Sequence, residues 1–117
     1  MPAPGAKPGF DLAAMQAHAG DAAQLLKALA NERRLQVLCL LAGREHSVGE
    51  LNELLDVSQP ALSQHLAVLR EEGLVATRRE AQTIHYSLAP GPAAAVMATL
   101  YGAYCERPSG GSGSAAA

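Results

Sequence analysis

The sequence SVGELNELLDVSQPALSQHLAVLREEGLV, residues 47–75, predicts two short helices joined by a tight turn. Ser47 and Glu50 have the spacing of a capping box, in which each side chain pairs with a backbone N–H of the other residue at a helix start. Ser58 is suited to cap a second helix, because its hydroxyl can accept a hydrogen bond from the first turn. Residues 56–57, between the helices, form the predicted turn.

The second helix of this pair has one apolar face. Leu62, Leu66 and Leu69 follow one another at intervals of four and three residues, the spacing of a helix face that packs on a core. Pro60 falls in the first turn, where its missing N–H costs little, and Gly73 ends the helix. The polar residues on the other side of this helix are therefore available to contact a partner.

The flanking segments complete a mostly helical domain with a small β-hairpin. Residues 11–30 and 32–42 carry apolar residues at helical spacing, and we expect a last helix that extends to about Cys105. Residues 74–79 and 83–88 alternate in polarity and predict a two-stranded hairpin. This order indicates a winged helix-turn-helix fold, in which the second helix of the pair, the recognition helix, enters the major groove of DNA.

The composition predicts one domain with two short extensions. The length of 117 residues suits a single domain, which we place at residues 10–107, and an apolar content of 49% excludes a disordered chain. Residues 1–9 are expected to form a flexible arm and the Gly/Ser/Ala-rich residues 108–117 a disordered tail. Neither a membrane span nor a signal peptide is recognisable, so we expect a cytoplasmic protein.

The charge balance is unusual for a protein that binds DNA. The net charge is −2, whereas DNA-binding domains usually carry a basic surface. Arg78 and Arg79 concentrate positive charge on the hairpin, and a dimer would present this pair twice. We therefore expect affinity to depend on shape and base contacts, with a modest dependence on salt.

The residue types at the start of the recognition helix suit base contacts. Glutamine can form two hydrogen bonds with adenine, and serine can contact bases or phosphates. Each is also common on a solvated surface, as is a polar hairpin end, so the segment as a whole carries the prediction. The candidate DNA-binding residues are Ser58, Gln59, Ser63, Gln64 and His65 on the helix, and Arg78, Arg79 and Gln82 on the hairpin, which would grip phosphate or the minor groove.

The chain has two cysteines, Cys39 and Cys105, which lie 66 residues apart without a CxxC motif. A single free cysteine is most often an inert, buried residue. A permanent disulfide is rare in a reducing cytoplasm, where a redox-sensing pair is the usual exception. Because helical spacing puts Cys105 on one face with Met97 and Tyr101, the residues alone leave both interpretations open.

Three stretches, LKALANERRLQVLCLL (26–41), residues 47–75 and RREAQTIHYSL (78–88), together resemble the ArsR family of bacterial repressors. The resemblance covers about residues 21–105 and implies a repressor of operator DNA that is a homodimer through its first and last helices. Family members that bind metal use cysteines at the start of the recognition unit or Asp/His pairs on the last helix. This chain has neither, and His65 and His85 lack partners at ligand spacing, so we expect no metal or cofactor.

The segments LANERRLQVLC (29–39) and LYGAYC (100–105) resemble the persulfide-sensing branch of that family. The resemblance implies that Cys39 and Cys105 are a dithiol sensor for low-molecular-weight persulfides or other thiol-reactive species. Their modification would release DNA and derepress sulfide-detoxification genes. The alternative is a general oxidant-responsive or virulence-gene regulator in which the same cysteines form a simple disulfide.

Two other classes of function are weaker hypotheses. An enzyme such as a thiol peroxidase would need an activated nucleophile, and no Cys-His-Asx arrangement or oxyanion loop is recognisable, so we expect no enzymatic activity. A winged helix that binds protein instead of DNA would fail to bind the promoter of its own or a neighbouring gene.

Overall fold

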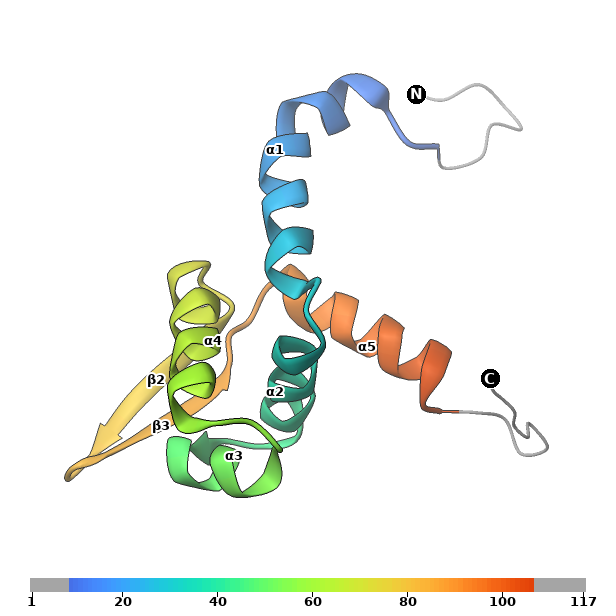
Figure 1. Ribbon diagram of the computed structural model, residues 1–117. Coiled ribbons are helices and arrows are strands. Elements are labelled where there is room, and N and C mark those ends of the chain that lie inside the picture. Colours follow the sequence, from blue (N-terminus) through green and yellow to red (C-terminus); the bar gives the residue numbers. More distant parts are fainter. Residues whose placement is uncertain (1–8, 107–117) are drawn as a thin grey trace.

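A computed structural model describes residues 9–106, which form a helical body with a small sheet (Figure 1). Most of the expected arm and the whole expected tail, including Pro108, lie outside the described residues. None of the helices described is long and apolar enough to cross a membrane. The elements are α1 (Leu12–Leu29), α2 (Glu32–Gly43), β1 (His46–Ser47), α3 (Val48–Leu54), α4 (Gln59–Glu71), β2 (Val75–Glu80), β3 (Thr83–Leu88) and α5 (Pro92–Tyr104).

The helix starts have the caps that the sequence predicts. Ser47 Oγ accepts a hydrogen bond from the Glu50 backbone at 3.1 Å, and Glu50 Oε1 accepts one from the Ser47 backbone at 3.0 Å, which confirms the capping box. Ser58 caps α4 through its side chain, as predicted, and Asn31 caps α2 in the same way. Gly73, just beyond α4, has a φ of +75°, which glycine adopts without a steric cost. Local sequence therefore determines where these helices begin and end.

The sheet has three strands, one more than the sequence predicts. Its order is β1-β3-β2 and both pairings are antiparallel, with His46 of β1 opposite Tyr86 of β3. Strand β1 has two residues, too few for any alternation of polarity to show. The hairpin turn is also shorter than expected, because Glu80 belongs to β2 and pairs with Thr83.

The core lies where α2, α3 and α4 meet the base of the hairpin. Leu62, Leu66 and Leu69 of α4 are all buried, as their spacing predicts. They pack in one cluster with buried residues of α2, α3, β2 and α5. The largest side chains with almost no exposure are Val37, Leu38, Leu51, Leu62 and Leu69.

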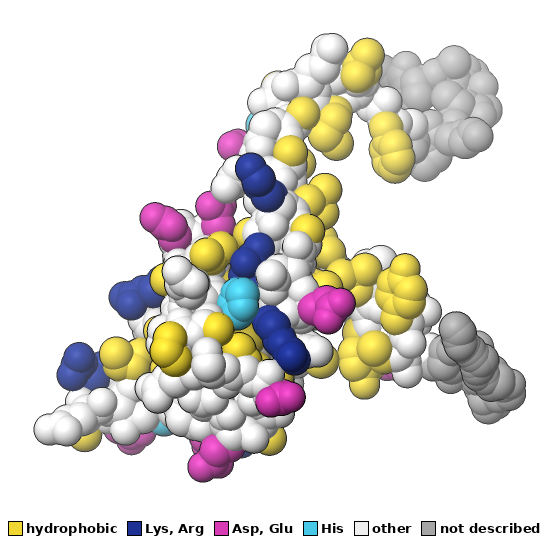
Figure 2. Space-filling view, viewed as in Figure 1, with side chains coloured by type: hydrophobic (Ala, Val, Ile, Leu, Met, Phe, Trp, Pro, Cys, Tyr) yellow, Lys and Arg dark blue, Asp and Glu magenta, His cyan; other side chains and the backbone are white. Residues whose placement is uncertain are grey.

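Helix α1 projects away from this core, and α5 leaves the body in a different direction (Figure 1). The predicted apolar stripe of α1 is exposed over most of its length, with Leu12 68% and Met15 54% exposed, and only Ala28 and Leu29 are buried. Hydrophobic side chains gather along α1 on the side toward α5, and on α5 itself (Figure 2). The periodicity of apolar residues thus predicted α1 correctly, but no other part of the described chain buries most of its apolar face.

The buried face of α4 gives a test of the fold. We expect Leu62→Ala to lower the free energy of unfolding by about 2–5 kcal/mol, because it removes a side chain with no exposure and leaves a cavity. Leu54→Ala, at a residue that is 57% exposed on α3, is the matched control and should cost less than about 1 kcal/mol. Urea denaturation followed by circular dichroism measures both, and equal losses would contradict the assigned core.

Candidate nucleic-acid interface and cysteine pair

The start of α4 presents the predicted polar residues to solvent. Leu62 and Leu66 are buried on the side of α4 that faces the core. The polar residues on the other side are exposed: Ser58, Gln59, Ser63 and Gln64. Residues four apart share a helix face, so Gln59 and Ser63 lie side by side. This exposed face has the residue types that contact bases in a major groove.

The turn before α4 is held by a side chain that the sequence analysis missed. Asn52 Nδ2 of α3 donates a hydrogen bond to the Val57 carbonyl at 3.0 Å, and Asn52 is half-buried. The bond ties the end of the turn back to α3 and so sets the direction in which α4 leaves. The position of Asn52 near the end of the first helix of the pair is the one local sign in the sequence that its amide could bind the turn.

His65 lies half-buried on α4, on the side where the helix approaches α2. Burial, together with the positive charges of Arg34 and Arg33, lowers the pKa of His65 below its ordinary value of 6.5. Arg34 is itself fixed, since its Nε donates to the Ala28 carbonyl at 2.6 Å. His65 is therefore uncharged at neutral pH, with one ring nitrogen able to donate and one able to accept.

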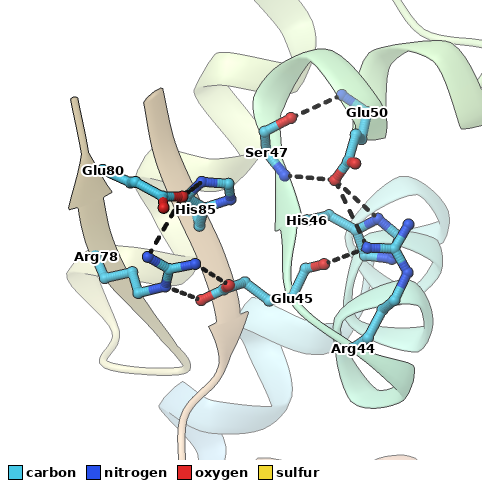
Figure 3. Close-up of polar contacts among 8 residues, drawn as sticks. All are labelled: Arg44, Glu45, His46, Ser47, Glu50, Arg78, Glu80 and His85. Atoms are coloured by element: carbon cyan, nitrogen blue, oxygen red, sulfur yellow. Dashed lines mark hydrogen bonds and ion pairs between the residues drawn. The ribbon is translucent and has the colours of Figure 1, made fainter. Parts of the chain in front are cut away.

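The two adjacent arginines of β2 have different surroundings. Arg78 makes two hydrogen bonds of 2.8 Å to the carboxylate of Glu45, which lies between α2 and β1 (Figure 3). This contact lowers the pKa of Glu45 and raises that of Arg78. Arg79, one residue on, lies on the opposite face of the strand, and no acidic side chain among residues 9–106 pairs with it. Both arginines are exposed, as is Gln82 in the turn, but among the described residues Arg78 alone of the two is paired with a carboxylate.

The two histidines near the sheet each lie close to a carboxylate. His85 Nε2 lies 3.2 Å from Glu80 Oε1, and the buried His46 has its Nδ1 3.6 Å from Glu50 Oε1 (Figure 3). Over the described part of the chain, no group of three or more His, Cys, Asp or Glu residues could hold a metal ion.

Both cysteines line one apolar cavity between α2 and α5. The cavity has a volume of about 290 Å³, and neither cysteine is in the core, since both are exposed and free. Cys39 also borders a second cavity of about 510 Å³, where Glu106 is the one acidic lining residue. The residues around the cavity shared by both cysteines are all uncharged: Leu35, Gln36, Cys39, Met97, Leu100, Tyr101, Tyr104 and Cys105.

This arrangement defines a class of DNA-binding protein. A short helix and a recognition helix are joined by a tight turn and followed by an antiparallel hairpin, the wing (β2, residues 81–82 and β3). Such a winged helix-turn-helix uses its second helix to contact the major groove.

Comparison with known proteins identifies the family. The family model described as bacterial regulatory protein, arsR family, matches residues 31–77. The transcriptional activator HlyU of Vibrio cholerae serotype O1 is 52% identical over 97 residues, which are 83% of this chain and 90% of HlyU. The biofilm growth-associated repressor of Agrobacterium fabrum is 52% identical over 94 residues, which are 80% of either chain. The chain therefore belongs to the ArsR family of bacterial transcriptional regulators.

Solved structures support the same assignment. Reduced HlyU from Vibrio cholerae matches with a TM-score of 0.74 at 54% identity, over 78% of this chain and 96% of that one. The homodimeric winged helix-turn-helix domain Mb0332 from Mycobacterium bovis, a possible ArsR-family regulator, matches with a TM-score of 0.66 at 35% identity, over 79% and 83%. The expected fold is confirmed, and regulators of this family bind DNA and act as dimers, which agrees with the expectation of a non-enzymatic protein.

The lowered pKa of His65 predicts how stability depends on pH. Because this pKa is lower in the folded than in the unfolded chain, the unfolded chain binds more protons below the ordinary value of 6.5. We expect the free energy of unfolding to keep its maximum value above pH 6.5, and to decrease as the pH is lowered below 6.5. His65→Gln should flatten this loss, as followed by urea denaturation at several pH values. His18→Gln, on the exposed part of α1, is the control, and identical slopes for His65→Gln and wild type would contradict the prediction.

Proposed function

We propose that this protein is a homodimeric repressor that releases operator DNA when persulfides modify Cys39 and Cys105, so that sulfide-detoxification genes are derepressed. The observation that supports the proposal is the single cavity bordered by both thiols. The cavity has no charged lining residue, so it suits added sulfur atoms better than a charged ligand. Cysteine exposure supplies the access that a reactive thiol needs.

The proposed DNA surface is the exposed start of α4 together with the wing. Gln59 and Ser63 would contact base edges, while the other polar residues would contact bases or phosphates. Arg79 and Gln82 at the end of the wing would reach the backbone or the minor groove. The full proposed set is Ser58, Gln59, Ser63, Gln64, His65, Arg78, Arg79 and Gln82.

The proposed dimer uses α1 and α5. Leu12, Met15 and Leu26 of α1, with Tyr101 and Tyr104 of α5, are between 46% and 77% exposed in one chain. Such apolar faces are rarely left in water, and a second copy would cover them. The relative Mb0332 is itself described as homodimeric.

The switch would work through the packing of α5 on α2. A sulfur bridge from Cys39 of α2 to Cys105 at the end of α5 would change that packing and so the proposed dimer interface. The two recognition helices must lie about 34 Å apart to fit successive major grooves, so a small shift costs base contacts. Couplings between sites are typically about 1–3 kcal/mol, and a near-complete switch needs more.

The sulfur chemistry of the bridge balances without another oxidant. One thiolate takes the outer sulfur of a persulfide RSSH and releases RSH, and a second persulfide lengthens the chain to Cys–S–S–SH. The other cysteine then attacks the middle sulfur and releases hydrogen sulfide, which leaves a trisulfide. Sulfur from the persulfides is the oxidant, whereas peroxide would give a direct disulfide, for which the Cα atoms must approach within about 7 Å.

Intact-protein mass spectrometry tests the sensor. We expect anaerobic glutathione persulfide to add whole sulfur atoms with loss of two hydrogens, and peroxide to add none. Loss of two hydrogens with both reagents would instead indicate the simple disulfide of a general oxidant-responsive or virulence-gene regulator, and no change would exclude a cysteine switch. Cys39→Ser and Cys105→Ser are informative controls because the chain has two cysteines. Release of a labelled operator, followed by fluorescence anisotropy, links the mass change to DNA binding.

The recognition helix has its own test. We expect Gln59→Ala to weaken operator binding by about 1–3 kcal/mol, the usual value of one specific base contact, and to relax sequence preference at one position. Gln16→Ala, at an exposed position of α1, should leave the dissociation constant unchanged. Equal binding of operator and random duplex by both variants and the wild type would contradict direct base recognition.

A further inference from the structure

The guanidinium of Arg78 has acidic groups on two sides, although its side chain is 53% exposed. Its Nε and one terminal nitrogen each donate a 2.8 Å hydrogen bond to Glu45, so one edge is fully used. The other terminal nitrogen lies 3.7 Å from Glu80 Oε1 (Figure 3). Two carboxylates therefore surround one cation.

The register of the sheet explains how Glu45 reaches Arg78. Arg78 pairs with His85 of β3, and His85 pairs with Ser47 of β1, so these three positions form one row across the sheet. Glu45 precedes β1 and lies near this row on the outer face. The opposite face of β2 packs on the body, since Val75 is buried and Thr77 is half-buried.

This placement affects what Arg78 can offer to DNA. An arginine binds a phosphate best through two parallel N–H groups, and here Glu45 uses such an edge. A phosphate that approaches the remaining nitrogen meets Glu80. Since these two carboxylates more than offset the charge of this one guanidinium, they weaken its attraction for a polyanion.

We propose that Glu45 masks Arg78 and thereby limits the attraction of the wing to the phosphate backbone. The masked arginine contributes to DNA binding only after the Glu45 ion pair opens, so Arg79 is the immediately available cation of the wing. Glu45 is then a positioning residue that lowers affinity for DNA of any sequence. The inference rests on the wing being part of the DNA surface, as proposed above, and is independent of the cysteines.

Three variants distinguish whether Glu45 masks Arg78 or instead holds Arg78 in a pose that contacts DNA. Glu45→Gln removes the competing charge and keeps a hydrogen-bonding oxygen. Glu45→Asp shortens the acidic side chain by one methylene and so weakens the contact without changing net charge, and Arg78→Gln removes the masked cation. Asp21→Asn, exposed on α1, matches the charge change of Glu45→Gln far from the wing. Dissociation constants are measured by anisotropy with reduced protein, on operator and random duplexes over a range of salt. Thermal denaturation verifies that each variant folds.

Masking predicts tighter binding by Glu45→Gln, about two- to fivefold at about 0.1 M salt, on both duplexes. The slope of log K against log salt should steepen by about one for each protomer, as for one more phosphate contact. Glu45→Asp should shift binding in the same direction by a smaller factor. The gain should vanish when Glu45→Gln is combined with Arg78→Gln.

Three results would overturn the inference. Weaker binding by Glu45→Gln would mean that Glu45 supports Arg78 in a DNA-contacting pose. An undiminished gain in the Arg78→Gln background, or an equal gain with Asp21→Asn, would mean that only overall charge matters. If Glu45→Gln does not fold, the equal-charge variant Glu45→Asp decides, and unchanged binding by a folded Glu45→Asp would contradict masking.

Discussion

The burial of one leucine face of α4 is the constraint on which the remaining structure depends. Leu62, Leu66 and Leu69 anchor this helix in the core, so its rotation about its own axis is determined. With the rotation determined, the helix must present Gln59 and Ser63 outward. The hydrogen bond from Asn52 to the Val57 carbonyl then constrains the direction in which α4 leaves the turn. Stability and the proposed DNA surface thus have a common origin in one amphipathic helix.

The two outer helices follow a different principle. Helix α1 contributes only its C-terminal part to the core, where Ala28 and Leu29 are buried and Leu25 packs against the cluster. Leu12 and Met15, nearer the start of α1, are exposed and add little to the stability of one chain in isolation. In the proposed dimer a second copy would cover these exposed residues, and assembly would then be coupled to folding.

Sequence patterns predicted the parts of the structure that depend on near neighbours. Caps, helix ends and the hairpin involve residues a few positions apart, and all were placed within one or two residues. Strand β1 was missed because it forms only by pairing with β3, 38 or more residues later. The Glu45–Arg78 pair, separated by 33 positions, was missed for the same reason. The resemblance to a family singled out the two cysteines. The cavity that they share could not be predicted, because it forms only where α2 packs against α5, far apart in the sequence.

The residues that line the shared cavity come from α2, from α5 and from Cys105 just beyond α5. None of them belongs to α4 or the wing, the elements proposed to contact DNA. If the proposed roles hold, mutations that alter the chemistry at the thiols would leave the residues that select a promoter untouched, and the reverse would also hold. In evolutionary terms, this separation would let a duplicated copy of the gene acquire a new inducer while it kept its old target genes.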